Sequence, residues 1–350
     1  MSKEALLKTH KKQVAEKVKL GLILLAVLLA AILFCTSIGV TDSDIGSVFS
    51  VLVKLIKGEA ISTQTDKVIL HLRLPRTILA VLAGFGLAFS GSVMQGIARN
   101  PLVSPFTIGV SSAAAFGAAL TIVYGIGFFG SSKWGIVLNA FTVAILCAIF
   151  IFAIAYKVGL NSTSLILTGI SMNYLFQAMS TAIQFTANDA KLAQVVAWSF
   201  GSLNGAQWDQ IKITSIVTMI SFVMLLRINH PLTILSIMDD DISKTMGIDP
   251  NKTRAIGTLF SVITTAAIIS FTGIIGFVGL AAPHIARTLV GNDYRIFLPI
   301  SGIVGALLVL IGDTLGRTIL SPVIIPVGVI ISFIGVPIFI HQVVFGNQRA

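Results

Sequence analysis

The charged side chains of this sequence that suit the binding of a partner are few, and they stand at the ends of long apolar runs. Arg73 and Arg76 lie three residues apart at the start of one run, and Arg317 lies at the end of another. A guanidinium is always charged in proteins and pairs with a carboxylate through two parallel hydrogen bonds. The three arginines therefore suit the binding of carboxylates. The alternative is that they only extend from a bilayer toward its polar surface.

A second charged group lies between two apolar runs, at about 229–253. Three acids, Asp239 to Asp241, favour the N-terminus of a helix there. Gly247 stands where a C-terminal cap belongs. A second short helix is expected to begin at Asp249 and Pro250, with Asp as cap and Pro as first residue. The segment therefore predicts a compact helix-turn-helix, with a solvated loop as the alternative.

Motifs for catalysis are absent from the sequence. It contains no G-x-x-x-x-G-K-[ST], no H-E-x-x-H, no G-x-S-x-G and no cysteine cluster. All fourteen acidic residues fall in loops or near the ends of apolar runs, with Asp313 the most deeply placed. Because ion-coupled transporters keep ionisable residues within the membrane, this distribution argues against ion coupling. His71 and His284 have no second ligand at helical spacing, so no metal site is expected.

Composition shows which elements must position these residues. Of 350 residues, 55% are hydrophobic and 11% are charged, whereas soluble domains carry about 25% charged residues. Since about 20 apolar residues span a bilayer, run length predicts an all-α polytopic membrane protein. Its ten helices are expected at 20–40, 70–95, 105–124, 134–156, 163–186, 208–228, 254–273, 277–290, 296–313 and 325–345.

The distribution of Lys and Arg predicts the orientation. Fifteen lie on the side of the N-terminus and nine on the other, which places both termini in the cytoplasm. The chain thus divides into a basic arm at 1–19, one membrane domain at 20–345 and a tail at 346–350. Six lysines of the arm account for much of the net charge of +10, and without aromatic residues beside them they do not indicate nucleic-acid binding. Cys35 and Cys147 lie in apolar segments and are expected to be free thiols.

Three groups of residues make the chain resemble a known family. They are Leu72-Arg73-Leu74-Pro75-Arg76, then Ser90 to Gly96 followed by Arg99-Asn100-Pro101-Leu102, and finally Gly273 to Leu280 followed by Pro283 to Arg287. Their order and spacing resemble the FecCD/BtuC-like permeases of type II ABC importers. These proteins take up iron siderophores, haem and vitamin B12.

The resemblance implies ten transmembrane helices and several partners. The partners would be a second permease subunit, two ATPase subunits that bind ATP and Mg²⁺, and an external substrate-binding protein. The chain itself would be no enzyme, would hold no cofactor, and would lie in a bacterial cell membrane. A ferric siderophore is the favoured cargo, with haem or cobalamin as alternatives. Two alternatives outside the ABC importers are an ion-coupled secondary transporter and a passive channel or membrane scaffold.

The resemblance also implies roles for particular residues. Binding-protein docking is assigned to Arg73, Arg76 and Arg317. The cytoplasmic gate is assigned to Asn100, Pro101, Leu102, Ser162 and Thr163, with helix capping as the alternative for Asn161 to Ser164. Coupling to the ATPase is assigned to Asp240, Asp241, Ser243, Lys244, Met246, Gly247 and Ile248. The translocation path is assigned to Ser171, Asn173, Gln177, Ser180 and Thr181, which are expected near one side of a helix.

Overall fold

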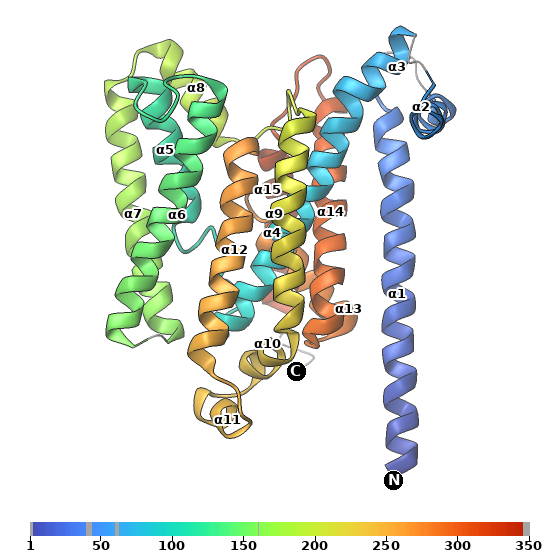
Figure 1. The fold of residues 1–350 in the computed structure, drawn as a ribbon, viewed down its shortest axis with the longest axis vertical. Coiled ribbons are helices and arrows are strands. Elements are labelled where there is room, and N and C mark those ends of the chain that lie inside the picture. The colour runs from blue at the N-terminus through green and yellow to red at the C-terminus, as the bar shows by residue number, and fades with distance from the viewer. Residues whose placement is uncertain (1–2, 40–43, 60–62, 160, 346–350) are drawn as a thin grey trace.

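The computed structural model describes residues 3–39, 44–59, 63–159 and 161–345, and these residues form helices and no strand (Figure 1). Each of the ten predicted apolar runs contains a helix. In chain order the helices are α1 (Lys3–Ser37), α2 (Ile45–Lys57), α3 (Gln64–Val68), the π-helical turn η1 (Ile69–Arg73), α4 (Leu74–Ala98), α5 (Val110–Tyr124), α6 (Lys133–Val158), α7 (Ser162–Thr186), α8 (Asp189–Ser199), α9 (Trp208–Arg227), α10 (Asn229–Ile237), α11 (Asp240–Thr245), α12 (Pro250–Thr272), α13 (Val278–Val290), α14 (Tyr294–Thr318) and α15 (Val327–Phe345).

Six helical stretches in the described part of the chain are long and apolar enough to cross a membrane. They are Lys11–Ser37, Gln64–Ala98, Lys133–Val158, Trp208–Arg227, Pro250–Thr272 and Tyr294–Thr318. The first of them belongs to α1, which runs without a break from Lys3. The expected basic arm is therefore the beginning of this helix and not a separate element, and the expected tail at 346–350 lies outside the described residues.

The short helices α2, α3 and α8 were not predicted. Helices α2 and α8 each begin at a side-chain cap: Asp44 accepts a hydrogen bond from the Ser47 amide at 2.8 Å, and Asn188 from the Lys191 amide at 3.0 Å. Run length detects only helices that are apolar all round, whereas these caps are the signal that identifies short helices.

Helix α4 lies at the centre of the bundle and packs on α14 and α13 through glycines. A Cβ atom on Gly84 would come within 2.2 Å of the Gly305 carbonyl oxygen, and one on Gly91 within 2.0 Å of the Gly279 oxygen. Backbones can approach this closely only where side chains are absent, as in membrane helices packed through small residues. The bundle is thus tightly packed along α4.

A π-helical turn precedes α4, so that α3, η1 and α4 form one continuous helical stretch. Pro75 stands in the first turn of α4 and has no N–H to donate to the preceding turn. A wider turn before a proline accommodates this missing hydrogen bond. The distortion falls at Arg73, one of the predicted docking residues.

The predicted helix-turn-helix is formed by α10, α11 and the start of α12, and we call these residues, 229–253, the knob. Asp239 is the N-cap of α11, and Gly247 follows its end at a φ of 79°. The amide of Ile248 donates to the Ser243 oxygen at 3.0 Å and that of Gly247 to the Lys244 oxygen at 2.9 Å, which is a Schellman cap. Asp249 caps a helix that begins at Pro250, as expected. Only the expected length was wrong, because this helix is α12, which continues to Thr272.

The knob and the start of α1 lie at the same end of the molecule (Figure 1). We call this the knob end. The other end, which carries Arg73, Arg76 and Arg317 at the start of α4 and the end of α14, is called the arginine end.

Candidate functional site

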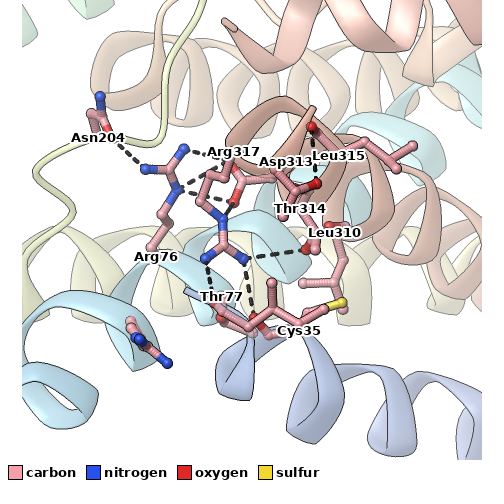
Figure 2. Close-up of polar contacts among 12 residues, drawn as sticks. Cys35, Arg76, Thr77, Asn204, Leu310, Asp313, Thr314, Leu315 and Arg317 are labelled. Atoms are coloured by element: carbon pink, nitrogen blue, oxygen red, sulfur yellow. Dashed lines mark hydrogen bonds and ion pairs between the residues drawn. The ribbon is translucent and has the colours of Figure 1, made fainter. Parts of the chain in front are cut away.

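Two of the three predicted docking arginines, Arg76 and Arg317, meet at one buried carboxylate at the arginine end, that of Asp313 (Figure 2). Arg76 donates to both oxygens of Asp313, from Nε at 2.9 Å and from Nη2 at 2.8 Å. Arg317 Nε lies 3.3 Å from the second oxygen, four residues along α14. Only 2% of Asp313 is exposed, so its charge is compensated by these two arginines rather than by water.

Arg73 and Arg317 also hold the C-terminus of α1. Arg317 donates to the carbonyl oxygens of Cys35 and Ile38, both at 3.1 Å. Arg73 donates to those of Ser37 at 2.7 Å and Thr36 at 3.3 Å. The last carbonyls of a helix have no partner within it, and its C-terminal end attracts cations. The two arginines therefore cap α1 with charge and with hydrogen bonds.

Each predicted docking arginine thus has partners within the chain. Arg73 is buried, and Arg76 and Arg317 are mostly covered. Arg76 reaches furthest outward, because its remaining nitrogen donates to Asn204 in the exposed turn before α9. Docking of a binding protein at these arginines stays a prediction. The sequence analysis missed Asp313 as their partner, although its spacing of four from Arg317 was a readable signal.

The two predicted gate segments lie side by side at the knob end. The hydroxyl of Ser162, in the first turn of α7, donates to the carbonyl of Ile97 in the last turn of α4 at 3.2 Å. Asn161 caps α7 by accepting from the Ser164 amide at 2.8 Å, which shows the capping geometry weighed as an alternative. In the turn after α4, which holds Asn100, Pro101 and Leu102, the Asn100 side chain accepts from the Leu102 amide.

One carboxylate joins this turn to the knob. Asp240, in the first turn of α11, receives hydrogen bonds from Arg99 Nη2 at 2.6 Å and from both terminal nitrogens of Arg254 at 2.7 Å. Arg99 also donates to the Leu235 oxygen at the end of α10. Hydrogen bonds from Arg254, and then from Arg99, lower the pKa of the Asp240 carboxyl to about 2. Helices α4, α10, α11 and α12 therefore meet at one ion-pair cluster.

The predicted coupling residues divide into two groups. Ser243 and Ile248 are buried and Asp240 faces Arg254, so these three support the knob from within. Asp241, Lys244, Met246 and Gly247 are exposed. The sequence analysis missed that the knob also exposes apolar side chains of Ile237, Met238 and Ile242 beside Met246. Exposed apolar residues so close together are typical of a surface that another protein covers.

Four of the five predicted path residues, Asn173, Gln177, Ser180 and Thr181, share one side of α7, and Ser171 lies off that side. Ser171 is exposed and two residues from Asn173, a spacing that turns side chains apart. Asn173 accepts from the Ser112 hydroxyl of α5, and Ser180 is buried. Gln177 and Thr181 are exposed and one turn apart. A role of these residues in a path stays a prediction.

The model of one protein family, the FecCD transport family, matches residues 25–345. The chain belongs to the FecCD transport family. This confirms the resemblance drawn from the sequence motifs, since the match includes all three of them. The FecCD match also covers every site residue described above.

Relatives of this FecCD chain cover nearly its whole length. An ABC transporter permease protein of Methanocaldococcus jannaschii is 37% identical and covers 95% of this chain and 96% of its own. The Fe(3+)-citrate import system permease YfmE of Bacillus subtilis is 34% identical, and the match covers 98% of this chain and 99% of YfmE. Other relatives are named as permeases for iron(3+)-hydroxamate in B. subtilis, hemin in Yersinia pestis and cobalamin in Halobacterium salinarum.

A solved structure resembles this FecCD chain closely. It is a metal-chelate type ABC transporter in an inward-facing conformation, with a TM-score of 0.82 and 30% identity over 94% of this chain and 99% of that one. The all-helical membrane fold expected from the sequence is therefore that of an ABC transporter permease.

Proposed function

We propose that this chain is the permease subunit of an ABC importer that carries an iron chelate across the cell membrane into the cytoplasm. The observation that carries the proposal is the FecCD match over residues 25–345. Ten helices would span the bilayer, with the knob end in the cytoplasm. Two permease subunits, alike or paralogous, would enclose the path, and two ATPase subunits would bind the ATP and Mg²⁺. An external binding protein would supply the cargo.

The knob would receive the ATPase subunit on its exposed apolar side chains, Ile237, Met238, Ile242 and Met246. Apolar anchors with charged neighbours are the usual composition of such contacts. A displacement of α11 would then pass through Asp240 to Arg99, which stands directly before Asn100. The gate segments would move because their turn is ion-paired to the knob.

A ferric chelate is the favoured cargo, because the relative named for Fe(3+)-citrate matches over almost the full length of both chains. Haem and cobalamin are the alternatives within the family, since relatives are named for these as well. The buried Asp313 stands near the end of α14 and is paired with two arginines. It therefore has the surroundings of a structural ion pair rather than of an ion-coupling site.

Uptake into proteoliposomes tests the proposal. The chain would be reconstituted with an ABC ATPase subunit from the same source, and a binding protein would be added outside, loaded with radioactive ferric citrate or a ferric hydroxamate. We expect uptake that needs ATP in the lumen, is blocked by vanadate and is indifferent to proton or sodium gradients. Uptake driven by such a gradient without ATP would contradict it. Uptake of haem or cobalamin alone would change the cargo and keep the ABC assignment.

A further inference from the structure

A groove between α6 and α12 is independent of the sites described above. The two helices lie side by side (Figure 1), and the space between them measures about 590 Å³. Each helix contributes six lining residues. Small side chains, among them Ala148, Ala153 and Ala255, leave the space open, and Tyr156 and Leu259 are more than half exposed beside it.

The lining of this groove is almost entirely apolar. The hydroxyls of Tyr156 and Thr258 are the only polar side-chain groups among the lining residues. The groove opens on the surface of two helices that are both apolar enough to cross a membrane. Its walls therefore suit a hydrocarbon chain and offer little to a polar ligand.

Two lysines stand at the knob end of the groove. Lys157 follows the lining residue Ala153 by four positions near the end of α6, and Lys252 precedes the lining residues Ala255 and Ile256 by three and four near the start of α12. Residues three and four apart share a helix face, so Lys252 lies on the lining face of α12 one turn beyond the groove. Lys157 directly follows the lining residue Tyr156 and lies at the edge of the lining face of α6.

The charges of both lysines are available to a ligand. Each side chain is exposed, and neither has a carboxylate within salt-bridge distance in the described part of the chain. The acid nearest to Lys252 in the sequence is Asp249, whose carboxylate accepts hydrogen bonds from the amides of Asn251 and Lys252 at the start of α12. The two lysines could bind a phosphate group, and the apolar groove beside them could hold the acyl chain of the same lipid.

We propose that the groove between α6 and α12 binds an anionic phospholipid. One acyl chain fills the space beside Ala148 and Ala255, and the phosphate lies between Lys157 and Lys252. Basic pockets between membrane helices recognise acidic headgroups through this arrangement. Tyr156, at the same end of the groove, stands where aromatic side chains meet the polar surface of a bilayer.

Native mass spectrometry of the full-length chain in detergent tests this site, with phosphatidylglycerol and phosphatidylcholine as probes. The wild-type chain is expected to retain phosphatidylglycerol in preference to phosphatidylcholine. Since each lysine near an acidic headgroup contributes about 1 kcal/mol, Lys157→Gln with Lys252→Gln should weaken phosphatidylglycerol binding roughly 30-fold. Lys212→Gln, an exposed lysine on α9, is the matched control and should leave binding unchanged.

A second variant separates the groove from the lysines. Ala255→Phe fills the groove and keeps both charges, so it should abolish preferential retention while the protein stays folded by circular dichroism. Equal retention of the two lipids by the wild-type chain would overturn the proposal. So would unchanged phosphatidylglycerol binding in the double lysine variant, or in the groove-filled variant.

Discussion

The guanidinium of Arg99 and the carboxylate of Asp240 lie 2.6 Å apart, although 141 positions separate them in the sequence. The pair ties the turn after α4 to the first turn of α11. Arg254 of α12, which is almost fully buried, donates hydrogen bonds to the same carboxylate. Asp240 is therefore bound by one arginine from α12 and by one from the turn after α4. A displacement of the knob would therefore act directly on Arg99, the residue before Asn100.

The first prediction concerns this link. Asp240→Asn removes the charge that both arginines need, so we expect ATP hydrolysis by the reconstituted complex to persist while cargo uptake per ATP falls about tenfold or more. Asp241→Asn is the matched control, since Asp241 is exposed and pairs only with Lys244 in the same helix. An equal loss of uptake and hydrolysis in the Asp240 variant would show loss of assembly and not of coupling.

The second prediction concerns acid. The pKa of the Asp240 carboxyl is lowered from 3.8 to about 2, so its contribution to stability is complete above about pH 4 and is lost as the pH falls toward 2. The protection factors of the α11 amides, which correct for the intrinsic pH dependence of exchange, should therefore be unaffected by this group between pH 5 and about 8, and should fall only in strong acid. Asp240→Asn should show lower protection than the wild type above about pH 4, and the difference should disappear as the wild-type carboxyl is protonated toward pH 2. A change near neutral pH in the wild type alone would contradict the assignment.

The third prediction concerns Asp313. Asp313→Asn leaves the charges of Arg76 and Arg317 without their shared carboxylate, and breaking a buried ion pair on one side typically costs about 3–5 kcal/mol. We expect a clear fall in the midpoint of thermal unfolding in detergent. Asp209→Asn, an exposed acid paired with Lys212 on the surface, should have almost no effect. Equal midpoints for the two variants would show that the cluster is not structural.

The fourth prediction separates docking from structure among the arginines. Arg73 and Arg317 cap α1, so reversing their charge should destabilise the chain whether or not they receive a binding protein. Arg76→Gln keeps both caps and is the sharper test. We expect it to weaken capture of the binding protein in a pull-down while unfolding changes less than in Arg317→Gln. Normal capture by the Arg76 variant would remove Arg76 from the docking surface.

The fifth prediction concerns the glycine contacts of α4. A Cβ on Gly91 would meet the Gly279 carbonyl at 2.0 Å, and backbone cannot yield as a flexible side chain can. Gly91→Ala should therefore destabilise the fold by about 1–3 kcal/mol or prevent it from forming. Gly276→Ala is the control, because nothing lies within 4 Å of the position its Cβ would take. Expression and unfolding of the two variants measure the difference.

Long apolar runs predicted the large helices because bilayer-crossing helices are apolar on nearly every face. The Schellman cap at Gly247 was predictable too, since it depends on residues adjacent in the chain. Arg76 and Asp313 are 237 positions apart, and no local pattern relates them. Ion pairs between distant positions depend on which helices pack together. A single sequence does not show this packing. The same reason explains why the ion pair of Asp240 with Arg254 was not predicted.

The glycine contacts have a mechanical consequence. Where α4 touches α14 and α13 backbone to backbone, no side chain can change rotamer to let the helices slide, so we expect the three helices to move together as one rigid body. A displacement of Asp240 would then change the backbone mainly at the end of α4, where the rigid body ends. Arg99 is the residue at this boundary, and its φ of 48° is a conformation that a non-glycine residue rarely holds. We therefore expect the predicted gate to turn about Arg99, whose side chain is bonded to Asp240 of the knob.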